Sequence, residues 1–146
     1  MRRLVMLVLA LAAVAIAVTA CGSEANDYRG DVKKVQDKYL ADLEKYRTSV
    51  QTAVATDPAS ASAQLDQLSA TMTKFADEVE AIKPPDDQKE QAAQLVGAYR
   101  ASADAATQLK EAAATGDVGA IQAAIEAFNK AQQQETAAIT ALNAAD

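Results

Sequence analysis

The chain has 146 residues with a net charge of −6, half of its residues are hydrophobic, and it contains one cysteine and no histidine. Without histidine, the sequence excludes imidazole metal ligands and the Ser-His and Cys-His pairs that activate a nucleophile. A single cysteine excludes a disulfide within the chain and a cysteine-cluster zinc site. We therefore predict a protein that is not an enzyme, with no catalytic residues, no bound metal and no cofactor.

The N-terminal segment has the pattern of an export signal. Met1, Arg2 and Arg3 give it a positively charged start, and fifteen apolar residues follow without interruption in residues 4–18. A membrane-spanning helix needs about 20 apolar residues, so this stretch is short for a span and has the length of a signal peptide. It ends in Val18-Thr19-Ala20-Cys21, where small residues precede the single cysteine. We predict that residues 1–20 are a signal peptide that is removed.

The residues Val18-Thr19-Ala20-Cys21 resemble the lipobox of bacterial lipoproteins. Membership of this class implies transfer of a diacylglyceryl group to the Cys21 thiol, cleavage before Cys21, and usually acylation of the new amine. Residues 21–25 would then form a short lipidated tether. Because two or three acyl chains hold a protein firmly whereas one binds reversibly, the resemblance implies a protein anchored on the extracytoplasmic face of the cell membrane. Two alternatives stay open, namely an ordinary secretory signal with an incidental cysteine and a signal that is not cleaved.

The charge of the remaining chain bears on its partners. Removal of residues 1–20 takes away two of the 14 basic residues and none of the 20 acidic ones, which leaves a net charge of −8. An acidic body does not favour nucleic acid or anionic lipid headgroups as partners. We therefore predict that the lipid on Cys21 makes the membrane contact and that nucleic acid is not a partner.

Residues 26–146 fit one domain made of helices. Alanine accounts for 36 of the 146 residues, and no sustained alternation of apolar and polar residues indicates a strand. Apolar residues recur at steps of three or four from Tyr28 to Val54, which predicts a first amphipathic helix. Thr56-Asp57-Pro58 then predicts a break and a restart, with Asp57 as the N-cap of the second helix.

A pair of prolines separates the second predicted helix from the third. Apolar residues from Leu65 to Ile82 step by three and four, and Lys83-Pro84-Pro85 closes this second helix. It ends there because the residue before a proline is pushed out of the helical region. The third helix is predicted from about Asp86 to Thr115.

Gly116 and Asp117 predict the last connection. Gly116 suits a left-handed C-terminal cap, and Asp117 can cap a fourth helix. The large apolar residues of that helix are Ile121, Ile125, Phe128, Ile139 and Leu142. Four helices of roughly 25 to 30 residues, joined by connections of two or three residues, predict an all-α, antiparallel up-down-up-down four-helix bundle.

One layer in the middle of this bundle is the candidate ligand site. The second and fourth helices can be aligned with a shift of 60 residues, so that position 57 matches position 117, and most of their apolar residues then coincide. Gln132 and Glu135 are exceptions, because they are polar residues at positions where the second helix has apolar ones. The layer lies about 18 residues from the hairpin turns, or about 27 Å along a helix. Since bundle cores do host ligand sites, we predict a polar-lined cavity built from Glu135, Gln132, Tyr99 and Ser102, with Tyr39 and Phe75 as apolar walls.

Glu135 has a second interpretation. A carboxylate on a core stripe often lies at a helix edge, where the bundle is thin and water reaches the side chain. The alanines of the third helix would then let the helices approach closely and fill the space of a cavity. The sequence leaves both interpretations open.

Together these features predict a membrane-anchored, extracytoplasmic lipoprotein that serves as a protein-binding or envelope-assembly module. Its partner would be an envelope protein. The alternative is a small-ligand carrier or sensor that uses the mid-bundle cavity. The small size, the alanine-rich composition and the Pro-Pro junction are similar to those of many small lipoproteins of high-GC Gram-positive bacteria such as the actinobacteria, most of unassigned function.

Overall fold

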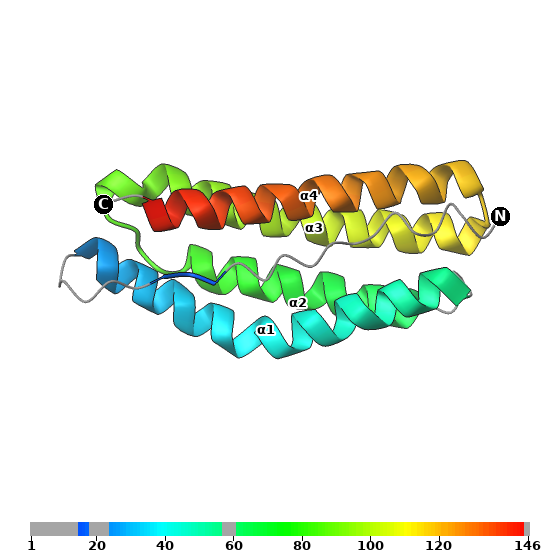
Figure 1. Ribbon diagram of the computed structural model, residues 1–146, viewed down its shortest axis with the longest axis horizontal. Coiled ribbons are helices and arrows are strands. Elements are labelled where there is room, and N and C mark those ends of the chain that lie inside the picture. The colour runs from blue at the N-terminus through cyan, green and yellow to red at the C-terminus, as the bar shows by residue number, and fades with distance from the viewer. Residues whose placement is uncertain (1–14, 18–23, 57–60, 145–146) are drawn as a thin grey trace.

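The computed structural model describes residues 15–17, 24–56 and 61–144. It contains four helices, α1 (Glu24–Thr56), α2 (Ser62–Glu80), α3 (Lys89–Thr115) and α4 (Val118–Ala144). Successive helices run in opposite directions, with α1 and α2 in one layer and α3 and α4 in the other (Figure 1). The predicted antiparallel up-down-up-down bundle is confirmed. Within the described ranges, no helix is both long enough and apolar enough to cross a membrane.

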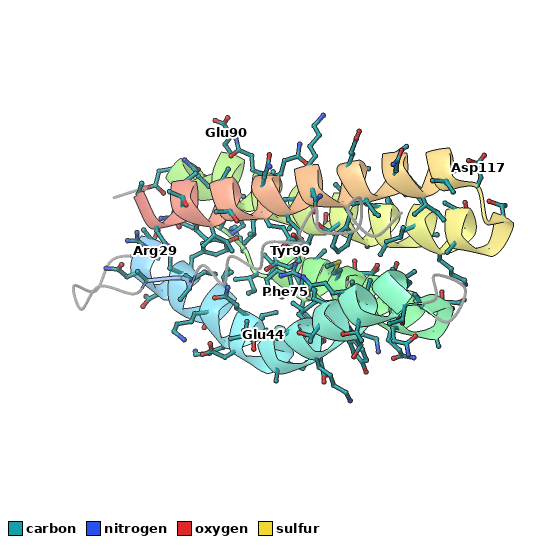
Figure 2. All side chains as sticks on the ribbon, turned by 45° about the vertical axis from the view of Figure 1, so that its right-hand side comes forward. Arg29, Glu44, Phe75, Glu90, Tyr99 and Asp117 are labelled. Atoms are coloured by element: carbon teal, nitrogen blue, oxygen red, sulfur yellow. The ribbon has the colours of Figure 1, made fainter. Side chains whose placement is uncertain are left out.

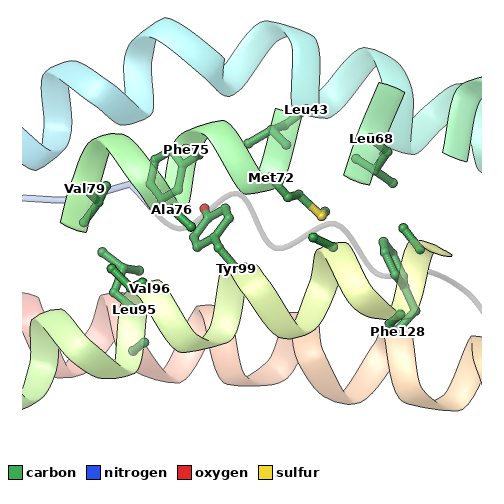
Figure 3. Packing of buried hydrophobic residues seen from close by; sticks show 14 of the residues in the cluster. Leu43, Leu68, Met72, Phe75, Ala76, Val79, Leu95, Val96, Tyr99 and Phe128 are labelled. Atoms are coloured by element: carbon green, nitrogen blue, oxygen red, sulfur yellow. The ribbon is translucent and has the colours of Figure 1, made fainter. Parts of the chain in front are cut away.

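A narrow strip of large apolar residues forms the core between the two layers. Phe75 and Met72 of α2 face Leu95 and Tyr99 of α3, and Leu43 reaches the same strip from α1 (Figure 3). Many other buried positions hold alanine, which lets the helices approach closely. The fully buried large side chains, at under 2 % exposure, include Phe75, Phe128, Leu65, Leu68, Met72, Leu95, Leu109 and Leu142.

The connection between α2 and α3 is longer than the sequence predicts. The helix α2 spans Ser62–Glu80, so residues 81–88 connect it to α3. The prolines explain this connection, since Pro85 is extended at ψ 161° and cannot continue a helix. A 3₁₀ turn, η2 (Asp86–Gln88), follows before α3 begins, three residues later than expected. The predicted cap Asp57 lies outside the described residues.

The turn between α3 and α4 is confirmed in detail. Gly116 has the left-handed conformation, with φ 68°, and its backbone N–H donates to the Ala113 carbonyl at 3.3 Å. Asp117 caps α4, because its Oδ1 accepts from the backbone N–H groups of Gly119 at 2.8 Å and Ala120 at 3.1 Å.

Replacement of each of two glycines by alanine is expected to change the stability of the protein in opposite directions. A Cβ atom at Gly116 or at Gly97 would meet nothing within 4 Å, so only the backbone conformation differs. Gly116→Ala places a side chain at positive φ and should lower the free energy of unfolding by about 1 kcal/mol. Gly97→Ala, within α3, should raise that free energy by about 0.5–1 kcal/mol. Urea denaturation of both variants measures the two signs, and effects of the same sign would contradict this description of the turn.

The buried face of α1 follows the predicted apolar stripe only in part. Val35, Tyr39 and Tyr46 are only half-buried, whereas the polar residues Gln36 and Arg47 are buried. The reason is that α1 packs closely against α2 but not against α4, and reaches α4 through long polar side chains. We call the line formed by Arg29, Gln36 and Arg47 of α1 and by Glu135 and Asn143 of α4 the α1–α4 seam.

Candidate functional site

Three aromatic rings from three helices meet in the middle of the bundle. Phe75 of α2 lies between Tyr99 of α3, with ring centroids 4.0 Å apart, and Tyr39 of α1, with centroids 6.3 Å apart and an edge-to-face angle of 82°. Figure 2 places Phe75 and Tyr99 between the two layers, while Glu44 and Glu90 lie on the outer surface. The structure therefore brings together the three aromatic residues of the predicted layer.

Glu135 is buried and paired. Its side chain is 6 % exposed, and its Oε2 accepts from Arg47 Nη2 at 2.5 Å. The Ser102 hydroxyl, from α3, donates to Oε1 of the same carboxylate. Neither sequence interpretation describes this arrangement, because Glu135 lies away from the wet edge and its charge is compensated within the protein. The ion pair joins α1 to α4, and the Ser102 bond adds α3.

Burial sets the electrostatics of this layer. Burial raises the pKa of Glu135, while the Arg47 charge and the hydrogen bonds from Ser102 and Arg47 pull that pKa down. Burial also raises the pKa of Tyr99 far above its usual value, and the nearby charge of Glu135 adds to that effect. The guanidinium of Arg47 supplies the positive charge that compensates the carboxylate.

Two buried donors beside this ion pair lack an acceptor among the described residues. They are Nε2 of Gln132, one turn before Glu135 on α4, and Nε of Arg47. A buried donor without a partner costs about 1–3 kcal/mol. An oxygen atom from water or from a ligand would satisfy either one.

Surface hollows lie outside this layer. One hollow between α3 and α4 is lined by small and amide residues, namely Gln94, Gly97, Ala98, Gln134, Ala137, Ala138 and Ala141. A second one, nearer the Gly116 turn, includes Ala112, Ala120, Ala123 and Ala124. A third, between α2 and α3, has Val79, Ile82 and Val96 in its lining and Lys89 and Arg100 beside them. Glu135 lines none of these three hollows.

Arg47 is the member of the site that the sequence prediction missed. It lies four residues after Leu43 and three before Val50, so it shares their buried face. A search for apolar periodicity gives no weight to an arginine. The signal that could have found it is the pair of opposite charges, one on the apolar stripe of the first helix and one on that of the fourth.

Tyr28, near the start of α1, gives a pH prediction. Its hydroxyl is buried and has no hydrogen-bond partner in the part of the chain that the structure describes, and burial raises its pKa to about 12 from an ordinary value of 10.0. A pKa that is higher in the folded state means stability that is present below pH 10 and lost as the pH rises towards 12. Tyr28→Phe should raise the free energy of unfolding at pH 7 by about 1 kcal/mol and reduce the alkaline loss. Guanidinium denaturation between pH 8 and about 12 tests this, and an alkaline loss as large as in wild type would contradict it.

Cys21, the predicted lipidation site, lies outside the described residues, as do the other lipobox residues Val18, Thr19 and Ala20. No protein-family model matches the chain, and comparisons with curated proteins and with solved structures likewise found no significant match.

Proposed function

We propose that this protein is a lipoprotein held on the extracytoplasmic face of the cell membrane by a lipid on Cys21. The observation that carries this proposal is the placement of the single cysteine, which follows a basic start, fifteen apolar residues and the small residues Thr19 and Ala20. A lipid anchor also accounts for membrane attachment of a body with a net charge of −8, which anionic headgroups would repel.

We further propose that the four-helix bundle is a protein-binding or envelope-assembly module. The support is the state of Glu135, whose carboxylate is already bonded to Arg47 and Ser102 and needs no ligand to compensate its charge. The α3–α4 face adds to this, because one hollow on it is lined by alanine, glycine and glutamine, over which another protein surface can pack.

Labelling with radioactive palmitate tests the anchor. The wild-type chain should carry label and sediment with membranes, whereas Cys21→Ser should lose both properties. Ala25→Ser, a few residues beyond the cleavage point, is the control and should keep the label. A wild type without label, or label that survives Cys21→Ser, would contradict the lipoprotein proposal.

Crosslinking in the native membrane tests the binding module. A photoreactive residue in place of Ala137, on the α3–α4 face, should give a discrete adduct with an envelope protein. The same residue at Glu44, on the exposed face of α1, is the control for chance proximity. Identical adducts from both positions would speak against a binding face on α3 and α4.

The unpaired donors at mid-bundle favour a second candidate function, a small-ligand carrier or sensor. A ligand oxygen could accept from Gln132 Nε2 and Arg47 Nε, both of which are buried. Native mass spectrometry of protein gently extracted from its membrane should then show a retained small molecule that Gln132→Leu loses. A wild type that carries no such molecule would leave the binding module as the better proposal.

A further inference from the structure

Residues 15–17 pack into one end of the α1–α4 seam. Ile16 is 2 % exposed and belongs to the same apolar cluster as Val32 and Leu142. In Figure 1 these residues form the short blue trace beside the first half of α1. They lie within the predicted signal peptide, so the bundle holds a segment that the proposed maturation removes.

Side-chain amides from two helices bind the backbone of this segment. Gln36 Oε1, on α1, accepts from the Ile16 N–H at 3.2 Å. The Asn143 carboxamide, on α4, accepts from the Ala17 N–H at 2.9 Å and donates to the Ala15 carbonyl at 3.1 Å. Asn143 thus contacts the backbone on both sides of Ile16, as a neighbouring strand would.

Arg29 fixes the position of Asn143. Its Nη1 donates to the Asn143 backbone carbonyl at 3.2 Å, and its Nη2 donates to Asn26 Oδ1 at 2.7 Å. The last turn of α4 holds no basic residue of its own, so Arg29 of α1 supplies the cation that favours the end of this helix. The backbone of Asn143 is therefore held by a contact that does not depend on the segment.

We propose that this end of the α1–α4 seam is a docking site for an extended peptide with a branched apolar residue between two small ones. In the full chain, residues 15–17 fill the site themselves. Removal of residues 1–20, a step that rests on the proposed function, then opens the site to an extended segment of this kind from a partner protein. An extended segment suits the site because its backbone offers the donors and the acceptor that Gln36 and Asn143 bind.

The same contacts distinguish a peptide from an acyl chain. A hydrocarbon could fill the space of Ile16, but it offers no N–H or carbonyl to Gln36 and Asn143. Filling the site with lipid would remove the bond that the buried Gln36 amide makes to the segment, which is unfavourable. The apolar residue gives the contact area, and the backbone bonds give the preference for a peptide.

Peptide binding to the purified full chain tests the proposal. The probe is a fluorescent peptide with the sequence of residues 13–19, flanked by lysines for solubility, and the proteins carry Cys21→Ser so that no lipid is attached. Ile16→Asp should empty the site, because a carboxylate is costly where Ile16 is buried. The probe should bind Ile16→Asp at least about tenfold more tightly than wild type, in which the tethered segment competes at high effective concentration.

Two further changes test the backbone contacts. A probe methylated on the nitrogen that corresponds to Ala17 keeps its apolar surface but loses one donor, and should bind Ile16→Asp at least about tenfold more weakly. Adding Asn143→Leu to Ile16→Asp should have a similar effect, whereas Thr140→Leu, at an exposed position one turn earlier on α4, should not. The methylated probe leaves the protein unchanged, so it decides the matter even if Asn143→Leu unfolds the chain.

Three results would overturn the docking site. They are equal probe binding by wild type and Ile16→Asp, binding that ignores the methylation, and displacement of the probe by a fluorescent fatty acid that binds more tightly. None of these measurements depends on processing in the cell. Failure of the proposed function would instead show as membrane protein that still carries residues 1–20.

Discussion

Replacement of Glu135 by leucine is expected to lower the free energy of unfolding by about 3–5 kcal/mol. The change leaves the Arg47 guanidinium, whose side chain is 11 % exposed, buried without the carboxylate that it contacts at 2.5 Å. The Ser102 hydroxyl also loses its acceptor. Denaturation in guanidinium chloride, followed by circular dichroism, measures the effect. Glu126→Leu, at an exposed position on the same helix, is the control and should change stability by less than about 0.5 kcal/mol.

The double variant Glu135→Leu with Arg47→Met separates the pair from its surroundings. Each single change should be strongly destabilising because it leaves one buried charge alone. The double variant should return to within about 1 kcal/mol of wild type, because replacement of a buried ion pair by apolar residues is often neutral or stabilising. A double variant whose loss equals the sum of the single losses would show that the two side chains are not coupled and would contradict the arrangement of this layer.

Replacement of Phe75 by alanine is the second change with a large expected effect. Phe75 is 1 % exposed, and its ring contacts Tyr39 and Tyr99 in the mid-bundle layer. Truncation of a fully buried phenylalanine costs about 3–5 kcal/mol, through lost burial and the cavity that remains. Thermal and guanidinium denaturation measure the loss.

Two further variants define the cause of that loss. Phe75→Leu keeps most of the apolar volume and should cost less than Phe75→Ala. Lys74→Ala, next to it in sequence but exposed, should change stability by less than about 0.5 kcal/mol. A loss below about 1 kcal/mol for Phe75→Ala would mean that the ring is not part of a packed core.

Most of the fold follows from short-range patterns that the sequence displays. The left-handed Gly116 and the Asp117 cap each depend on contacts within three residues, so local preferences are enough to predict them. Lys83-Pro84-Pro85 marks the end of α2 for the same reason. The common layer of Tyr39, Phe75 and Tyr99 needed one further step, which was counting residues from the hairpin turns.

The parts that the sequence did not predict depend on distant residues. Arg47 and Glu135 are 88 positions apart, and neither helix shows by itself that the other supplies the opposite charge. The packing of Ile16 was missed because an apolar run at the start of a chain is interpreted as an export signal, and such a segment is left out of the core.

The intact mass of the protein extracted from its own cell membrane tests the central claim most directly. The lipoprotein proposal predicts a chain that begins at Cys21, whose thiol carries a diacylglyceryl group, with fragment ions that place the modification on that residue. The Cys21→Ser chain should lack this species. A membrane protein that begins at Met1, or one that begins at another residue and carries no lipid on Cys21, would contradict the proposed anchor.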